Sequence, residues 1–575
     1  MIATIGLLHA ALIIPVLACL LCLLLPRHQG QRALRLLPWV PLPLLLLAVV
    51  GDPPVMLHWD AMLFGAELGV DAMRRPFALL AGLLWSLAGV YAIAYLREDD
   101  HAKRFALFWL LTFVGTSVLI LAHDVASFYS GFAVMTFSGY GLVVHNGSRE
   151  ARHAGRIYLI MAVIGEGLII AGLILASSVS HSLMLSDFPA GIAASDSRHL
   201  ITGILLCGFG IKAGLALLHF WLPLAHPVAP TPASAVLSGV MIKAGLLGWL
   251  LVLPFAHEEM AAWGPVLFVL GLLGALGGGV LGICQQQAKA VLAYSSISQM
   301  GLMVMFLSAA MADPSLALAL LPLVTMFALH HGLAKGALFL AVGQLPASPR
   351  WWHALLLIWP GLALIGLPLS SGASAKLMLK DALKNSDALS QWLPYLLQSL
   401  SMAAFATSLL MLHFFRLIWH SGKPDQPPHR GTQSAWIASV IVVAVTPLLF
   451  APLLTYWVNP GLTLADCVDL LLPFFAALAA VYLWQRLRLS RVSLPAGDLL
   501  AVWQRLGHHL SQQSLAVLPL LVGGYQQSQR LGRFLVIKAQ RQQQHLNRIE
   551  LVLRREVVAL LIMVLLVFTG LLFLP

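Results

Sequence analysis

Apolar runs of about 18 to 25 residues recur from one end of this sequence to the other. A helix of that length, rising about 1.5 Å per residue, crosses the roughly 30 Å hydrocarbon core of a bilayer. Only 10% of the 575 residues are charged and 59% are hydrophobic, whereas about a quarter of the residues in an ordinary soluble domain are charged. The sequence therefore predicts an all-α polytopic membrane protein, with no room between the runs for a soluble catalytic domain.

The apolar runs predict about sixteen membrane spans. Their approximate bounds are 2–25, 34–51, 76–96, 105–122, 126–146, 156–178, 200–222, 233–254, 262–284, 289–309, 315–344, 353–383 with a break, 390–418, 434–457, 467–485 and 557–574. Residues 497–554 have a different pattern, in which leucines recur at helical spacing among Arg and Gln. This pattern predicts an amphipathic helix along the membrane surface, and a plain surface tether is the alternative.

Loop charge predicts the orientation of the chain. The basic loops hold Arg27, Arg32 and Arg35, then Arg97, Lys103 and Arg104, then Arg149, Arg152 and Arg156, whereas the second loop holds Asp52, Asp60, Glu67 and Asp71. Because basic loops stay on the cytoplasmic side, we expect the N-terminus outside and, with an even number of spans, the C-terminus outside as well. The formal charge of +11 then reflects membrane orientation rather than nucleic-acid binding.

Two smaller features point to structural roles. Cys19 and Cys22 have a ligand-like spacing, but they lie in an apolar run with no second pair, which favours small core side chains over a metal site. That first run has no basic residue before it, which favours a retained helix over a cleaved signal. Asp71, Arg74 and Arg75 lie at a predicted helix entry, and we expect them to be structural.

Residues 199–251 carry two lysines inside apolar segments, Lys212 and Lys243, on either side of a proline-rich stretch. A lysine at the centre of a membrane helix costs about 2.5 kcal/mol or more, so two of them beside broken backbone indicate an internal polar path. Counting from the loops places Lys212 about 18 Å deep and Glu166 about 15 Å deep from the opposite side. The two residues should therefore meet near the middle of the bilayer as an ion pair.

More ionisable residues follow in the irregular spans. His331 and Lys335 are four residues apart and share one helix face, and Lys376 follows Gly366, Pro368 and Gly372, which interrupt its span. Burial favours the neutral form of a lysine and a nearby carboxylate favours the charged form, so moving one charge can load or release a proton on its neighbour. The series Glu166, Lys212, Lys243, His331, Lys335 and Lys376 is thus a candidate proton relay, with His219, His226 and His330 as possible accessory groups.

Each candidate has a structural alternative. A lysine in a membrane helix can extend to the headgroups or tie two helices together. The three accessory histidines can equally be interfacial or packed side chains.

The motifs resemble the proton-conducting transporter family. They are KAGLALLHFWLPLAHPVAPTPASAVLSGVMIKAG from Lys212, AKAVLAYSSISQMG from Ala288, HHGLAKGALFL from His330 and GLPLSSGASAK from Gly366. That family comprises antiporter-like subunits of respiratory complex I, membrane subunits of group 4 hydrogenases such as formate hydrogenlyase, and Mrp-type cation/proton antiporters.

This resemblance implies two inverted five-helix repeats with discontinuous seventh and twelfth helices, and it assigns the key lysines of helices seven and eight to Lys212 and Lys243. His331 and Lys335 then match the helix-eleven pair, and Lys376 matches the helix-twelve group. The expected organisation is N-terminal helices over 1–104, a first repeat over 105–255, a second over 262–420, C-terminal helices over 434–485, a lateral segment over 497–554 and a final anchor over 557–575.

One position departs from the family pattern. Family members usually carry a Trp-Glu pair in helix five where this chain has Phe132 and Ala133, so the usual partner of the helix-seven lysine is absent. Either Glu166 replaces it or this half of the protein does not pump. Gln287 stands where an Asp commonly precedes the AKAVLAYSS motif.

The resemblance implies a proton-translocating membrane subunit of a complex I-related redox complex in a bacterial inner membrane, hydrogenase- or quinone-linked. The sequence has no flavin, cluster, haem or nucleotide motif, so we expect iron–sulfur or other redox centres in partner subunits, with further antiporter-like subunits as membrane partners. The alternatives are a subunit of an Mrp-type antiporter or related ion or inorganic-carbon transporter, and a scaffold that has lost pumping.

Overall fold

The computed structural model describes residues 2–50, 55–59, 65–345, 349–384, 393–420, 429–453, 463–488 and 493–494. The chain divides into two units, Met1–Ala496 and Gly497–Pro575, and every described residue belongs to the first. The predicted lateral segment 497–554 and the last span 557–574 therefore lie outside the described residues.

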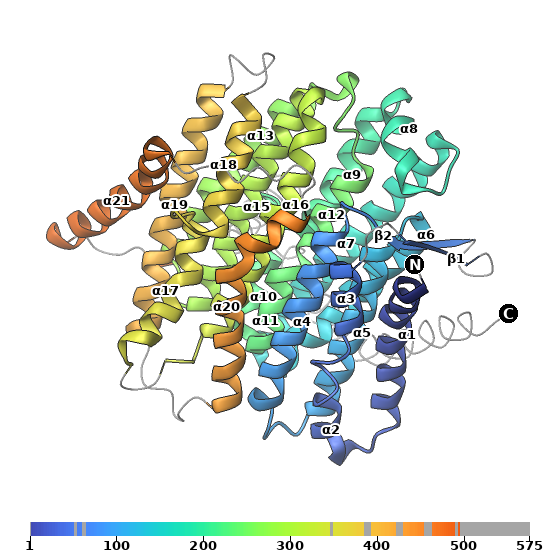
Figure 1. Cartoon of the computed structure of the whole chain (residues 1–575), viewed down its shortest axis with the longest axis horizontal. Helices are drawn as coiled ribbons and strands as arrows, with labels where there is room; N and C mark the ends of the chain where they lie inside the picture. The colour runs from blue at the N-terminus through green and yellow to red at the C-terminus, as the bar shows by residue number, and fades with distance from the viewer. Residues whose placement is uncertain are drawn as a thin grey trace, which may run out of the picture. The chain divides into compact units, whose positions relative to one another are not determined.

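Helices dominate the described part of the chain (Figure 1). The N-terminal elements are α1 Ile2–Leu24, η1 Arg27–Gln29, α2 Gly30–Leu34, α3 Leu42–Val50, β1 Val55–Trp59, β2 Ala66–Val70 and α4 Arg75–Tyr95. Next come α5 Ala102–Leu121, α6 Val125–Val143, α7 Arg149–Ser180, η2 Leu185–Asp187, α8 Phe188–Ala194, α9 Arg198–Ala213, α10 Trp221–Val228, α11 Thr231–Val236, η3 Leu237–Met241 and α12 Lys243–Val252.

The second half continues in the same way. Its elements are η4 Glu258–Met260, α13 Trp263–Leu272, η5 Leu273–Gly277, α14 Gly278–Ile283, α15 Ala288–Ala312, η6 Pro314–Leu316, α16 Ala317–Ala341, α17 Trp351–Ile365, α18 Ser371–Lys384, α19 Leu393–His420, α20 Arg430–Leu453 and α21 Leu464–Arg486. Eleven helical stretches among the described residues are long and apolar enough to span a membrane. They agree with the prediction of a multi-pass membrane protein.

The helices that are apolar enough to span a membrane differ widely in how much of each is buried by the rest of the protein. The best 18-residue window of Ala288–Ala312 is 100% buried and that of Thr231–Val252 is 94% buried, whereas that of α21 is 17% buried. These buried helices, α11, α12, α15 and α16, lie in the middle of the bundle (Figure 1), where α15 packs on α16 and α16 packs on α4, α18 and α20. A helix buried by protein on all sides can carry polar groups that lipid would not accept.

The second predicted span, 34–51, is wrong as a continuous helix. The chain forms α2 and then α3, with residues 35–41 in turns between them. Pro38 and Pro41 lie in these turns and Pro43 is the second residue of α3, and proline removes a backbone donor and disfavours helical backbone in the residue before it. The remaining helix of nine residues is about half the length needed to cross a bilayer.

The all-α prediction also missed a β-hairpin. Strands β1 and β2 pair antiparallel, from Val55 opposite Val70 to Trp59 opposite Ala66. The backbone of this hairpin continues into the bundle, because the His123 N–H donates to the Glu67 carbonyl oxygen at 2.8 Å. The hairpin lies within the acidic second loop, between Asp52 and Asp71, and each of its strands has only five residues, which is short for a pattern to be recognised in the sequence.

The expected structural roles of Asp71, Arg74 and Arg75 are observed. The Arg74 guanidinium pairs with the Asp71 carboxylate and donates two hydrogen bonds to the Ala122 carbonyl oxygen, at 3.1 and 2.7 Å. Arg75 donates to the carbonyl oxygens of Ala48 and Val49, at 2.7 and 3.0 Å. These bonds tie the start of α4 to α3 and to the end of α5.

Candidate functional site

The predicted span 200–222 is two helices with a break between them. α9 ends at Ala213, Gly214 adopts a left-handed backbone with φ of 75°, and α10 begins at Trp221. The break thus starts at a glycine, whereas Pro223 and Pro227 lie inside α10. Glycine reaches this conformation without steric cost, which is why the helix ends here.

Trp221 closes the gap by donating its indole N–H to the Ile211 carbonyl oxygen at 2.7 Å. Ile211 lies in the last turn of α9, where its carbonyl oxygen also accepts a long backbone bond of 3.4 Å from the Gly214 N–H, so the indole supplies its shorter bond.

Lys212 lies one residue before the end of α9 and faces a small cavity. Its Nζ donates to the Tyr158 hydroxyl oxygen at 3.3 Å and lies 5.5 Å from the centre of the Tyr158 ring. Glu166, on the same helix as Tyr158, lines the same cavity, which holds about 280 Å³ of empty space. Lys212 is 5% exposed and Glu166 is 4% exposed. The structure therefore brings the two oppositely charged groups into one enclosed site, where they attract each other electrostatically.

The departure from the family pattern lies in α6, which forms one wall of this cavity. Phe132 and Thr136 line the cavity from α6, and Ala133 is not among the lining residues. The carboxylate in this cavity comes instead from α7, through Glu166.

Lys243 lies deeper in the bundle and is fully buried. A π-helical turn, Leu237–Met241, directly precedes it, and its Nζ donates to the Ser238 carbonyl oxygen at 2.7 Å. The Ser238 hydroxyl bonds the Ser296 hydroxyl of α15 at 2.7 Å. A π-turn leaves a carbonyl group out of the regular helical ladder, so the local backbone supplies the acceptor that a buried ammonium group requires.

The helix α16 carries His330, His331 and Lys335, each at most 1% exposed. Lys335 Nζ donates to the Leu292 carbonyl oxygen of α15 at 2.9 Å. His330 Nδ1 lies 2.7 Å from the Ser371 hydroxyl at the start of α18. His331 interacts electrostatically with Lys243 and Lys335, so the structure brings these three groups together at the centre of the bundle.

Lys376 lies beyond a second break, which was predicted within 353–383. α17 ends at Ile365, Gly366 has φ of 88°, and α18 begins at Ser371. Lys376 is 8% exposed and its Nζ donates to the Ile365 carbonyl oxygen at 2.6 Å, so the ammonium group lies at the end of α17 rather than extending to the headgroups. The negative end of the helix dipole stabilises a positive charge there. His330 interacts electrostatically with Lys376, which connects this group to the central one.

The two remaining histidines differ in their surroundings. His226, on α10, is fully buried and stacks on Phe339 of α16, with ring centres 4.6 Å apart. It interacts electrostatically with Lys289, Lys335 and Lys243. His219 lies in the break between α9 and α10, with its ring 6.3 Å from that of Tyr294.

Several residues around these groups were not predicted as site residues. Tyr158 and Trp221 enclose Lys212, and Ser238 provides the acceptor for Lys243. Lys289, near the start of α15, donates to the Ala229 carbonyl oxygen at 2.8 Å, between α10 and α11. The sequence shows these residues only as isolated polar positions, because the groups that they contact are far away along the chain.

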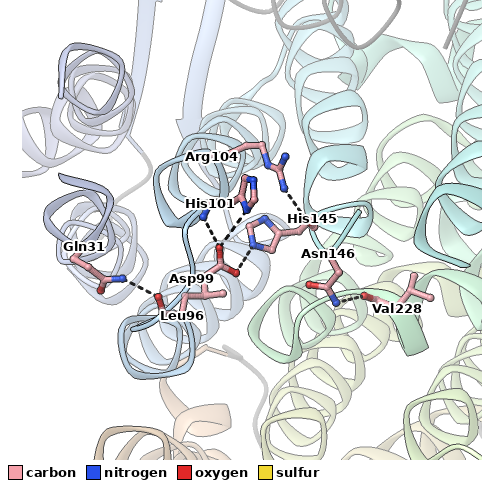
Figure 2. Close-up of polar contacts among 8 residues, drawn as sticks. All are labelled: Gln31, Leu96, Asp99, His101, Arg104, His145, Asn146 and Val228. Carbon is pink, nitrogen blue, oxygen red and sulfur yellow. Dashed lines mark hydrogen bonds and ion pairs between the residues drawn. The ribbon is translucent and has the colours of Figure 1, made fainter. Parts of the chain in front are cut away.

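A cluster of residues from two loops and from the first turn of α5 holds the end of α10 (Figure 2). His145 Nε2 donates to Asp99 Oδ2 at 3.0 Å, since a carboxylate can only accept. The Arg104 guanidinium donates to the His145 carbonyl oxygen at 2.6 Å, and the Asn146 side-chain amide donates to the Val228 carbonyl oxygen at 3.1 Å. This cluster therefore links the α4–α5 loop, the α6–α7 loop and the C-terminus of α10.

Burial lowers the pKa of His145 below its ordinary value, against the opposing effect of its bond to Asp99. For Asp99, burial alone would raise the pKa, but hydrogen bonds from His145 and from the His101 N–H hold it below its ordinary value.

Among the described residues, no group of three or more His, Cys, Asp or Glu side chains could hold a metal ion. Cys19 and Cys22 are free and buried in α1.

Comparison with known proteins agrees with this arrangement. Residues 122–351 match the family model described as "NADH:quinone oxidoreductase/Mrp antiporter, TM". The chain resembles this family over those residues. The resemblance predicted from the motifs is therefore confirmed, and the matched segment contains the buried groups from Glu166 to Lys335.

The antiporter-like chain is 32% identical to hydrogenase-4 component B of Escherichia coli over 294 residues. This match covers 48% of the chain and 43% of that relative, so the chain matches less than half of the relative's length.

Two solved structures have the same fold. The Mrp complex from Dietzia aligns with a TM-score of 0.69 at 19% identity, covering 90% of this chain and 62% of the other. The archaeal membrane-bound sulfane sulfur reductase, a respiratory membrane complex, aligns with a TM-score of 0.66 at 21% identity, covering 93% of this chain and 100% of the other.

Proposed function

We propose that this chain is a proton-translocating, antiporter-like membrane subunit of a complex I-related redox complex, hydrogenase- or quinone-linked. Protons would move through the relay Glu166, Lys212, Lys243, His331, Lys335 and Lys376. Iron–sulfur or other redox centres would reside in a peripheral module of partner subunits, beside further antiporter-like membrane subunits. The relationship to hydrogenase-4 component B supports the redox assignment.

One observation carries the proposal: the titratable side chains of the relay are buried, at most 8% exposed, and each lysine has a carbonyl or hydroxyl partner but keeps titratable neighbours. Lys243 and Lys335 both interact electrostatically with His331, and His330 interacts with Lys376. In a medium of low dielectric constant, adding a proton to one group disfavours protonation of the next. A charge arriving at one end can therefore release a proton at the other.

Glu166 supports the proposed relay in the N-terminal half of the chain. A carboxylate is needed near Lys212 to stabilise its charged form, and the usual helix-five position is Ala133. Since Glu166 and Lys212 line one cavity, Glu166 is placed to take that role.

The relay is tested by Lys212→Ala in the assembled native complex. We expect vesicles carrying this variant to lose proton uptake, whereas the matched surface variant Lys384→Ala, whose side chain is 57% exposed, keeps it. Uptake that survives in Lys212→Ala would rule out this lysine as a relay group and favour the pump-deficient scaffold.

The type of complex is tested by purifying the assembly through a tag on this chain and identifying its companions. A redox complex predicts iron–sulfur and catalytic subunits. Companions that are all membrane antiporter subunits would instead establish the alternative, an Mrp-type cation/proton antiporter or related transporter, which the family description also names.

A further inference from the structure

One face of α18 carries a row of lysines that begins at the buried Lys376 and ends at the last residue of the helix. Lys376, Lys380 and Lys384 are spaced four residues apart, which places them on one side of α18. Their exposure increases in the same direction: Lys376 is 8% exposed, and the side chains of Lys380 and Lys384 are 17% and 57% exposed. The basic groups thus lead from the bundle interior to its surface.

α21 supplies an acidic partner to the middle lysine. Lys380 Nζ lies 3.5 Å from Asp469 Oδ2, and the Asp469 side chain is 66% exposed. Next to this pair, Leu470 of α21 packs against Ala373 and Leu377 of α18. Asp469 is therefore held beside α18 while its carboxylate remains accessible.

A cavity that is open to the solvent joins these groups, and its volume is about 430 Å³ when the open space at its mouth is included. Lys376, Lys380, Asp469 and Ser401 provide its polar lining, and the rest of the lining is apolar, for example Leu302, Phe306 and Leu470. The cavity therefore connects the last buried ammonium group to a surface carboxylate, through walls that offer a proton few other sites.

We propose that the Lys380–Asp469 ion pair forms the outlet through which protons leave Lys376, an inference that rests on the relay proposed above. One N–H bond of the Lys376 ammonium breaks, water in the cavity carries the proton, and an O–H bond forms on the Asp469 carboxylate. The carboxyl group then loses this proton to the solvent, so the proton count balances and no electrons move. On the orientation predicted from loop charge, this end of α18 faces the outside.

The charges of the pair give the step its direction. The ammonium group of Lys380 lies one helical turn beyond that of Lys376, and the two positive charges repel each other. Asp469 is the more exposed partner of the pair, 66% against 17% for Lys380, so a proton that reaches its carboxylate can pass to the solvent. Lys384 and Asp381 pair with each other at 2.9 Å and are not among the lining residues of the cavity.

The test compares proton flux in vesicles that carry the assembled complex with Asp469→Asn, Lys380→Gln, Lys376→Ala or the control Asp381→Asn. We expect Asp469→Asn and Lys380→Gln to lower the flux about tenfold or more, while Asp381→Asn keeps it. Both variants should assemble normally, because an ion pair whose carboxylate is 66% exposed contributes little to stability. Wild-type flux in Asp469→Asn and Lys380→Gln, with flux lost in Lys376→Ala, would overturn the outlet but not the relay. Flux that persists in Lys376→Ala would remove the relay itself.

A chemical rescue experiment tests whether the outlet requires a carboxylate at position 469. Cys207 is exposed and would react with the same reagents, so it is first replaced by Cys207→Ser. In this background we expect Asp469→Cys to have low flux. Iodoacetate added from the outer face should restore part of the flux, because it places a carboxylate on the new thiol. Iodoacetamide adds a neutral group of similar size and should leave the flux low. Equal flux after the two reagents would overturn the role of the Asp469 carboxylate.

Discussion

The His145 imidazole is a buried titratable group that lies outside the membrane spans, in the loop between α6 and α7. Because its pKa is lowered on folding, the unfolded chain binds a proton more readily than the folded chain. The sign follows from linkage: stability is unaffected well above pH 6.5, about the ordinary pKa of histidine, and is lost as the pH falls through that value. Asp99, whose pKa is also lowered, contributes stability that is lost only in a more acidic range, below about pH 4.

We predict that His145→Gln makes thermal unfolding less dependent on pH between about 7.5 and 5.5. Glutamine keeps an amide N–H that can donate toward Asp99, but it does not titrate. The measurement is the melting temperature of the purified protein in detergent at both pH values. His420→Gln, which changes an exposed imidazole at the end of α19, should retain the wild-type difference. An equal pH dependence in His145→Gln and wild type would contradict the role of this imidazole.

At the scale of single helices, two breaks position the buried lysines. Each break begins at a glycine with positive φ, Gly214 or Gly366. Each also leaves carbonyl groups at a helix end: Trp221 takes one after α9, and Lys376 takes one after α17. Local backbone geometry therefore places polar acceptors in an apolar bundle without leaving them unpaired.

We predict that Gly214→Ala destabilises the protein by about 1 kcal/mol. A Cβ at this position would lie 3.6 Å from its nearest neighbour, a Leu222 methyl group, so the cost comes from the left-handed backbone and not from a clash. The matched control is Gly277→Ala, where the backbone is helical and no atom lies within 4 Å of the added Cβ. Chemical or thermal unfolding should show a loss for the first variant and none for the second, and equal stabilities would contradict this account of the break.

At the scale of the molecule, the orientation in the membrane follows from the basic loops. The α4–α5 loop should be cytoplasmic, and the stretch between α8 and α9 should be outside. Asp100 and Asp196 are exposed residues in these two segments.

We therefore predict that, in a Cys207→Ser background, Asp196→Cys reacts with a membrane-impermeant thiol reagent in intact cells, whereas Asp100→Cys reacts only in inside-out vesicles. The parent chain with Cys207→Ser gives the background labelling. The opposite pattern would invert the topology and would turn the proposed outlet toward the cytoplasm.

Much of this architecture is encoded locally and could be read from the sequence. Most span positions follow from hydrophobic length, since a membrane helix satisfies its own backbone and needs about 20 apolar residues. Lys212, Lys243, Lys335 and Lys376 stand out because a charge in an apolar run is costly. The break after Ile365 was predictable for a related reason, as Gly366 and Pro368 come close together there and both disfavour helical backbone.

Tertiary structure decided which of these groups share a site. The cavity that unites Glu166 with Lys212 depends on how α7 packs on α9, and the outlet depends on α21 lying beside α18, more than eighty residues further along the chain. Tyr158, Ser238 and Asp469 gain their roles only through contacts of this kind. Hydrophobic length acts within one segment, whereas electrostatic coupling acts through space, and only the packed helices bring distant charges together in a medium of low dielectric constant.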